Sequence, residues 1–242
     1  MHWAISYLRP REVSDCSGNN RFFNCVITMA SIAIIDYGMG NLHSIAKALE
    51  HVAGKDHIVV TSSHEQILSA ERVVFPGVGA IRDCMSELKK TGLDEVIAKA
   101  AADKPVLGVC LGMQALLDVS EENHGTGCLG MIHGKVVHFP RDMHGEGGDR
   151  LKIPHMGWNQ VRQQCEHAMW KNIPADSRFY FVHSYYTSPD DAGDVAATTP
   201  YGVEFASVIA RENIFAVQFH PEKSQHAGLQ LLSNFVGWNG DS

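Results

Sequence analysis

Gly108-Val109-Cys110-Leu111-Gly112 is the stretch that decides the fold, because it sets one cysteine between two glycines where a strand turns into a helix. An apolar run at residues 105–107 precedes it, and residues 113–117 have helical character. A reactive residue on so sharp a turn is typical of a nucleophile elbow, with cysteine here in place of serine. The glycines allow the turn without Cβ clashes, and the helix N-terminus favours a thiolate. A buried cysteine in an ordinary strand–turn–helix is the alternative interpretation.

Length, composition and charge limit the classes of protein to which the chain can belong. With 242 residues, 45% of them hydrophobic, it can bury a sizeable core in a single domain. The formal net charge is -7, and lysine and arginine occur singly or in pairs, so we expect no nucleic-acid partner. No apolar stretch of about 18 residues is present, so we expect no membrane span.

The spacings of cysteine and histidine argue against a metal site. The six cysteines include no C-x-x-C pair, so neither a zinc site nor a disulfide framework is expected, and a reducing cytoplasm fits better. The 14 histidines include no H-E-x-x-H or similar ligand pair. Gly38 and Gly40 begin a dinucleotide-binding pattern, but His43 occupies the position of its third glycine, which disfavours a nucleotide-binding module.

Residues 1–30 differ in character from the rest of the chain. They mix aromatic residues with proline, glycine and asparagine, and Arg9-Pro10-Arg11-Glu12 interrupts any apolar core of a secretory signal. An organelle transit peptide is a weaker alternative, because the segment contains acidic residues. We predict a disordered extension over residues 1–30, with Met29 as a natural start, and a single domain over residues 31–242.

Alternating strands and helices predict an α/β fold. Repeated β–α units with nearly continuous apolar strands indicate a central, mostly parallel sheet flanked by helices, and short strands joined by turns add an antiparallel sheet in the C-terminal half. A Gly-rich charged segment over residues 141–150 is expected to form a mobile surface loop. Strands are expected at residues 32–36, 58–60, 73–75, 105–109, 134–139, 158–162, 180–187, 195–199, 206–211 and 214–219, and helices at 42–52, 63–70, 81–101 and 228–236.

A thiol nucleophile needs a base, and residues 216–222 supply a candidate at the end of a predicted strand. Pro221 forces His220 toward extended geometry, in which residues two apart point the same way. Glu222 can then orient the His220 imidazole, so that Cys110, His220 and Glu222 match the roles of a catalytic triad. A strand-end histidine with a solvated glutamate is the alternative.

An oxyanion hole is the third element of such a site. The glycines of residues 76–79 leave amide N–H groups exposed after a strand that should lie beside the elbow strand. The N–H groups of Val78 and Leu111 are our candidates for holding a developing oxyanion. In isolation, an ordinary Gly/Pro loop is the simpler interpretation of residues 76–79.

With these elements placed, the sequence resembles the class I, triad-type glutamine amidotransferases, and more closely the glutaminase subunits of imidazole glycerol phosphate synthase. The resemblance covers roughly residues 31–238 and implies a flavodoxin-like α/β fold; residues 1–30 depart from the pattern. Six motifs carry it, at residues 36–42, 76–80, 108–114, 154–159, 181–185 and 218–224.

The resemblance implies hydrolysis of L-glutamine to glutamate and ammonia without a cofactor. Cys110 attacks the side-chain amide, His220 moves the proton, and Glu222 orients His220. By the same resemblance, five residues hold the α-amino and α-carboxylate groups of glutamine. These are Gln114 and the backbone around Gly77, His183, Ser184 and Tyr185. His183 has no Pro-Glu partner, so we do not assign it as the base.

The resemblance also implies a partner, a (β/α)₈-barrel synthase subunit that forms a heterodimer with the chain. This partner uses the ammonia to make imidazole glycerol phosphate and an aminoimidazole carboxamide ribotide in histidine biosynthesis. Trp158, Asn159 and Lys223 are our candidates for contacting it. The alternatives are a glutaminase subunit of a different synthase, a cysteine peptidase on a flavodoxin-like sheet, and a catalytically silent regulatory subunit.

Overall fold

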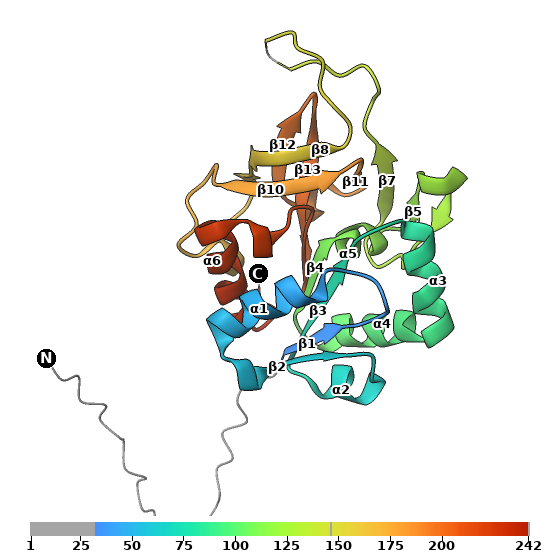
Figure 1. Ribbon diagram of the computed structural model, residues 1–242, viewed down its shortest axis with the longest axis vertical. Coiled ribbons are helices and arrows are strands. Elements are labelled where there is room, and N and C mark those ends of the chain that lie inside the picture. The colour runs from blue at the N-terminus through green and yellow to red at the C-terminus, as the bar shows by residue number, and fades with distance from the viewer. Residues whose placement is uncertain (1–31, 146, 242) are drawn as a thin grey trace, which may run out of the picture.

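The centre of the fold is a parallel sheet (Figure 1), and all of its strands except the edge strand at residues 58–61 are almost fully buried. The computed structural model describes residues 32–145 and 147–241, so the predicted extension over residues 1–30 lies outside the described residues. The nearly continuous apolar strands are explained by helices that cover both faces of the sheet. The parallel strands are, in spatial order, β2 (Ile58–Thr61), β1 (Ile32–Ile35), β3 (Arg72–Gly77), β4 (Val106–Cys110) and β14 (Ile214–Val217).

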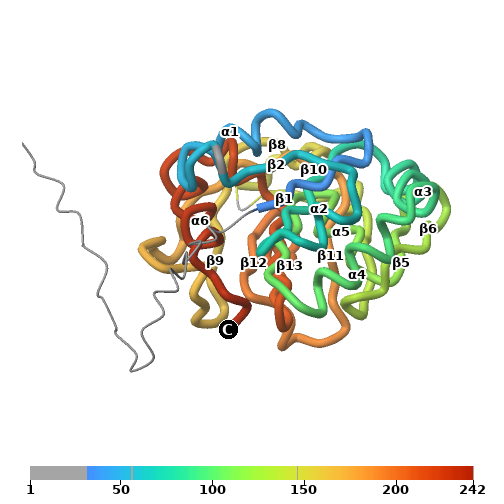
Figure 2. Tube along the Cα trace, turned by 90° about the horizontal axis from the view of Figure 1, so that it is seen from below, coloured from blue at the N-terminus to red at the C-terminus, as the bar shows by residue number. Residues whose placement is uncertain are grey.

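Two hydrophobic clusters lie on the two faces of this sheet. Alternate residues of β1 divide between them, because successive side chains of a strand point to opposite faces. Figure 2 shows α1 (Leu42–Ala53) and α6 (Gln225–Gly237) on one side of the sheet, and α3 (Ile81–Thr91) and α4 (Leu93–Asp103) on the other. The short α2 (His64–Ser69) is capped by Ser63, whose side chain accepts a hydrogen bond from the Gln66 N–H.

The single helix predicted over residues 81–101 is wrong, because Gly92 divides it into α3 and α4. Gly92 has φ 69°, and its N–H bonds to the carbonyl groups of Leu88 and Lys89 at the end of α3. A glycine in the left-handed region ends a helix in this way. Both halves have an apolar face, so the periodicity of the sequence continued across the break.

Antiparallel strands extend the central sheet beyond β14, which confirms the predicted antiparallel part. In this part β13 pairs with β14, β11 with β13, and β7 with β11. A separate two-stranded sheet pairs β8 with β10. The bounds are β5 (Val119–Ser120), β6 (Thr126–Gly127), β7 (Gly134–His138), β8 (His155–Gln160), β9 (Arg162–Gln163), β10 (Arg178–His183), β11 (Tyr185–Pro189), β12 (Val195–Tyr201) and β13 (Val203–Arg211).

The strand predicted over residues 180–187 is in fact two strands that belong to different sheets. β10 ends at His183, β11 begins at Tyr185, and only Ser184 connects them. The strand predicted over 158–162 is likewise divided between β8 and β9. Both divisions depend on which partner each backbone segment pairs with, and this is set by tertiary structure rather than by local propensity.

Short helical turns and loops complete the described chain. The segment at residues 141–150 joins β7 to β8, and of its described residues only Met143 is buried. Within the described residues, no helix has the length and apolar character needed to cross a membrane. The remaining helical segments are α5 (Leu111–Ala115), η1 (Lys55–His57), η2 (Glu122–His124), η3 (Ala168–Trp170), η4 (Ala192–Asp194) and η5 (Pro221–Lys223).

Gly112→Ala tests the close approach of α5 to β3. A Cβ at Gly112 would overlap the carbonyl oxygen of Phe75, and backbone has little freedom to move away. We expect the free energy of unfolding, measured by urea denaturation, to fall by at least about 2 kcal/mol. Gly237→Ala in α6 is the matched control, because nothing lies within 4 Å of a Cβ there. Equal stability of the two variants would contradict the proposed constraint.

Candidate active site

Three neighbouring parallel strands bring the candidate catalytic residues to one edge of the sheet. β3 and β4 end together, with Gly77 opposite Cys110, and β14 lies beside β4 and leads to His220. Ligands of open α/β sheets bind beyond the carboxyl ends of the strands. The topology therefore collects residues that are distant in sequence at the position where such sheets hold their substrates.

Cys110 occupies a strained backbone conformation between β4 and α5. It has φ 55° and ψ -106°, and its side chain lies at the N-terminus of α5 with 8% of the residue exposed. Positive φ in a residue with a Cβ is uncommon and concentrates at functional sites. The geometry is that of the nucleophile elbow predicted from the sequence.

The flanking glycines keep the turn free of Cβ clashes, as we predicted. Neither Gly108 nor Gly112 has a positive φ, so the left-handed conformation belongs to Cys110 itself. A Cβ at Gly108 would lie 2.8 Å from the Ala216 Cβ, and one at Gly112 would overlap the Phe75 carbonyl oxygen. Neither position has room for a Cβ, so glycine is needed at both. The two glycines let α5 pack directly on the neighbouring strands.

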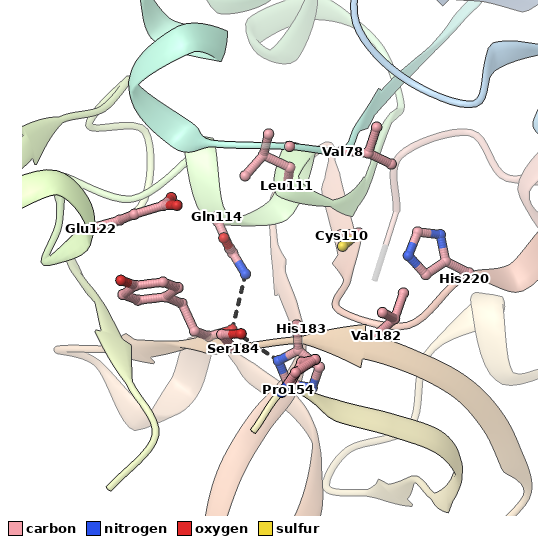
Figure 3. A pocket seen from close by; sticks show the side chains of 12 residues that line it. Val78, Cys110, Leu111, Gln114, Glu122, Pro154, Val182, His183, Ser184 and His220 are labelled. Carbon is pink, nitrogen blue, oxygen red and sulfur yellow. Dashed lines mark hydrogen bonds between the residues drawn. The ribbon is translucent and has the colours of Figure 1, made fainter. Parts of the chain in front are cut away.

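His220 and Glu222 form a buried pair beside Cys110. The His220 Nδ1 lies 2.9 Å from the Glu222 Oε1, and both side chains are almost fully buried. His220 has extended backbone as predicted, but Glu222 lies in the turn η5 rather than in a strand. The buried His220 Nε2 makes no hydrogen bond within the described residues. It is therefore free to exchange a proton with the thiol in the same pocket (Figure 3).

The charge state of His220 reflects competing effects. Burial lowers its pKa, but interactions with Cys110 and Glu222 outweigh burial and raise the pKa from 6.5 to about 10. An opposite charge nearby favours the protonated ring. The site thus stabilises an imidazolium, the form that a histidine takes after it accepts a proton.

Hydrogen bonds from β10 hold the loop that carries the pair. The His220 N–H donates to the Tyr180 carbonyl at 2.9 Å, and the Tyr180 N–H donates to Ser224 Oγ at 3.0 Å. The Ser224 hydroxyl in turn donates to the His220 carbonyl at 2.6 Å. Sequence analysis missed Ser224 and Tyr180 in this role, because their pairing joins segments that are 44 residues apart.

A cavity of about 350 Å³ lies in front of Cys110 and brings together most of the predicted site residues. This volume suits a small metabolite. Glu222 lies behind His220, and Gly77 lies within β3, opposite Cys110 in register. Both of these predicted residues are therefore outside the cavity lining. The lining residues are Val78, Gly79, Cys110, Leu111, Gln114, Glu122, Pro154, Val182, His183, Ser184, Tyr185 and His220 (Figure 3).

The predicted oxyanion residues lie on the side of the cavity formed by β3 and α5. Val78 is 39% exposed, and Leu111 is the first residue of α5. The buried Tyr37 hydroxyl donates to the Pro76 carbonyl at 3.1 Å, two residues before Val78. Tyr37 thus anchors the segment that carries one of the two candidate donors.

Gln114 and Gln218 connect the cavity wall to Cys110. The Gln114 Nε2 donates to the Tyr185 carbonyl and to Gln218 Oε1, both at 3.0 Å. The Gln218 Nε2 lies 3.6 Å from the Cys110 sulfur. Gln218 belongs to the sixth motif, but its contact with the thiol was not predicted, because side-chain direction at the strand end depends on packing.

Glu122 is a cavity residue that sequence analysis missed. Its Oε2 accepts a hydrogen bond from the Ile81 N–H at 2.9 Å, which fixes the carboxylate at the start of α3. It contributes the only carboxylate to the described cavity lining, which contains neither lysine nor arginine. No motif or spacing marked Glu122, because it reaches the cavity from a 3₁₀ turn after the elbow helix.

The three residues predicted to contact a partner lie in two different settings. Trp158 is 38% exposed on β8, and its ring contacts Tyr180, over whose ring the exposed Lys223 ammonium lies at 5.9 Å. Asn159 instead donates inward, to His155 Nε2 at 3.2 Å and to the Pro200 carbonyl at 2.9 Å. The exposed Met156 shares the outer face of β8 with Trp158.

Comparison with known proteins identifies the family. The model of the glutamine amidotransferase class-I family matches residues 33–237. The chain belongs to this family. It is 60% identical over 211 residues to imidazole glycerol phosphate synthase subunit HisH of Methylococcus capsulatus, which covers 87% of this chain and 97% of the relative. The subunit HisH of Nitrosococcus oceani is 60% identical over 214 residues, which covers 88% of this chain and 100% of the relative.

These relatives confirm the resemblance, and the chain is a member of the HisH glutaminase subunits of imidazole glycerol phosphate synthase, which act in histidine biosynthesis. A solved structure described as a putative GMP synthase protein from Thermoplasma acidophilum matches with a TM-score of 0.63 at 19% identity. The match covers 86% of this chain and 93% of that chain, and it supports the fold alone.

Glu222→Gln tests the origin of the raised His220 pKa. A raised pKa stabilises the folded state below the unfolded value of 6.5, and this contribution is lost as the pH rises through about 10. We expect Glu222→Gln to lower the free energy of unfolding most at pH 6 and least near pH 10, as measured by chemical denaturation. The exposed Glu95→Gln is the control, with a small effect at every pH. A pH-independent loss in Glu222→Gln would contradict this account.

Proposed function

We propose that the chain hydrolyses L-glutamine with Cys110, His220 and Glu222 and passes the ammonia to a synthase subunit. One observation carries the proposal. Cys110 lies on a strained elbow in the same cavity as the His220 Nε2, which has no hydrogen-bond partner among the described residues, while the His220 Nδ1 lies 2.9 Å from Glu222. A nucleophile, a base and an orienting carboxylate in this order are what acyl transfer requires.

The proposed reaction proceeds in two steps. His220 accepts the proton of the Cys110 thiol, and the thiolate attacks the side-chain amide carbon of glutamine. The N–H groups of Val78 and Leu111 are proposed to stabilise the negative oxygen that forms, and His220 returns the proton to the departing ammonia. Water, with His220 again as base, then hydrolyses the thioester to release glutamate and restore the thiol.

The polar lining of the cavity supports an amino-acid substrate. Glu122 is proposed to pair with the α-ammonium group, because its carboxylate is fixed by the Ile81 N–H and lies in the cavity. With no lysine or arginine in the described lining, the α-carboxylate is proposed to bind backbone N–H groups near Ser184 and Tyr185. Gln114 supports this wall through the Tyr185 carbonyl.

The proposed partner is a (β/α)₈-barrel synthase subunit that forms a heterodimer with the chain and consumes the ammonia. The names of the relatives, as subunits of imidazole glycerol phosphate synthase, support this proposal. The exposed Trp158 and Lys223 flank Tyr180, whose carbonyl holds His220, so a partner on this face would act close to the triad. Contact by Asn159 stays a prediction.

The described cysteines, all of them free thiols, support a reducing cytoplasm as the compartment.

Cys110→Ala, assayed with the synthase subunit, tests the proposed function. Glutamine-driven synthesis should fall at least about 1,000-fold, because the nucleophile is lost. Synthesis driven by added ammonium should persist, because it bypasses this chain. Both rates are measured as product formation by the complex, and Cys165→Ala, which changes an exposed cysteine, is the control. Retained glutamine-driven turnover in Cys110→Ala would refute the mechanism.

Glu122→Gln tests the proposed recognition of the α-ammonium group. Losing a charged hydrogen bond should raise the KM for glutamine roughly 10- to 100-fold, with a smaller change in kcat. Steady-state kinetics of glutamate release measure both constants. Glu121→Gln is the matched control, since Glu121 accepts a hydrogen bond from the His138 N–H outside the cavity lining. Similar KM values for the two variants would assign Glu122 a purely structural role.

A further inference from the structure

Two buried histidines stand side by side beneath the wall of the glutamine cavity. His155 of β8 lies opposite His183 of β10 in register, and they are only 3% and 5% exposed. The His155 Nδ1 lies 2.9 Å from the His183 Nε2. His183 lines the cavity, but His155 does not.

The groups at the two ends of this pair fix the direction of every hydrogen bond. The Tyr185 carbonyl can only accept, so His183 donates to it from Nδ1 at 2.8 Å. The Nε2 of a neutral His183 must then accept, so His155 donates from Nδ1. The His155 Nε2 accepts in turn from the Asn159 amide at 3.2 Å. Both rings are therefore Nδ1–H tautomers, aligned from Asn159 to Tyr185.

Burial and ring packing keep this arrangement in place. Desolvation lowers the pKa of His155 to about 4 and the pKa of His183 to about 3, so both rings are neutral near pH 7. The His155 ring stacks on Tyr201, with centroids 3.9 Å apart, and on Phe181, with centroids 4.9 Å apart. The aromatic contacts hold the ring plane, and the hydrogen bonds select its tautomer.

The aligned bonds end on groups that shape the cavity. The Tyr185 carbonyl accepts from both His183 and Gln114, and Gln114 continues through Gln218 to the Cys110 sulfur. A change in the tautomer or position of His183 would leave the Tyr185 carbonyl with one donor fewer. It would also release the peptide next to Ser184, where the α-carboxylate is proposed to bind.

We propose that His155 is a positioning residue for glutamine: its Nδ1–H holds His183 in the tautomer that orients the Tyr185 carbonyl and Gln114. The proposal rests on the proposed glutaminase function. His155 does not touch the substrate and acts only through His183. A substitution of His155 should therefore change the KM for glutamine more than it changes kcat.

Two substitutions separate the hydrogen bond from the packing. His155→Phe keeps an aromatic ring against Tyr201 but removes the donor, whereas His155→Asn keeps an amide donor near the Nδ1 position but loses the ring. In the complex with the synthase subunit, we expect His155→Phe to raise the KM for glutamine about tenfold with kcat changed less than about threefold. His155→Asn should recover most of the wild-type KM, although its thermal midpoint should be the lower of the two.

The opposite order, with His155→Phe near the wild-type KM and His155→Asn impaired, would overturn the proposal in favour of packing alone. Should His155→Phe fail to fold, Asn159→Asp makes the same test. It places an acceptor against the His155 Nε2, opposes the Nδ1–H tautomer, and should raise the KM similarly. An unchanged KM in folded Asn159→Asp would also overturn the proposal.

Imidazole ¹⁵N chemical shifts of the wild-type chain test the geometry without any turnover. Both His155 and His183 should give shifts of neutral Nδ1–H tautomers at pH 7. An Nε2–H tautomer or a charged ring at either position would overturn the proposal. Absence of glutamine hydrolysis by the wild-type complex would instead count against the proposed function, so the two failures are distinguishable.

Discussion

The close packing of α5 on β3 and β4 is the constraint on which the rest of the site depends. Gly112 lies directly on the Phe75 carbonyl of β3, and a Cβ at Gly108 of β4 would lie 3.3 Å from the Met113 nitrogen of α5, so no side chain separates α5 from these strands. With the two layers this close, the chain can pass from β4 into α5 only through a sharp turn. Cys110 takes the positive φ of that turn and presents its sulfur at the edge shared with His220.

Strand β10 links the parts of the site that the central sheet does not hold. The Tyr180 carbonyl at its middle holds the loop of His220 and Glu222, and His183 at its end supports the cavity wall. The backbone edge of β10 bonds to the loop of His220, while the His183 side chain on one face of β10 bonds to the Tyr185 carbonyl. The candidate base and the cavity wall therefore share one support.

The arrangement of the candidate triad was predictable from sequence because each of its members belongs to a local motif with its own backbone cue. The elbow glycines and the Pro221 constraint act within a few residues, so spacing alone indicated the geometry. Glu122 and His155 were not predictable in this way, because their roles depend on contacts with Ile81 and His183 from other elements. The helix break at Gly92 and the strand change at Ser184 were missed for the same reason: local periodicity continues through both.

The single-residue connection at Ser184 has a consequence for how the length of such chains can vary. β10 and β11 belong to different sheets, and Ser184 alone joins them. A residue inserted or deleted here would therefore have to shift one of the two strands. One added residue would reverse the facing of every side chain beyond it and would withdraw the Tyr185 carbonyl from Gln114. The described residues of the segment 141–150 are mostly exposed, so we expect this segment to accept such changes. Variation in length should therefore concentrate between β7 and β8, while the distance from Arg178 to Pro189 stays constant.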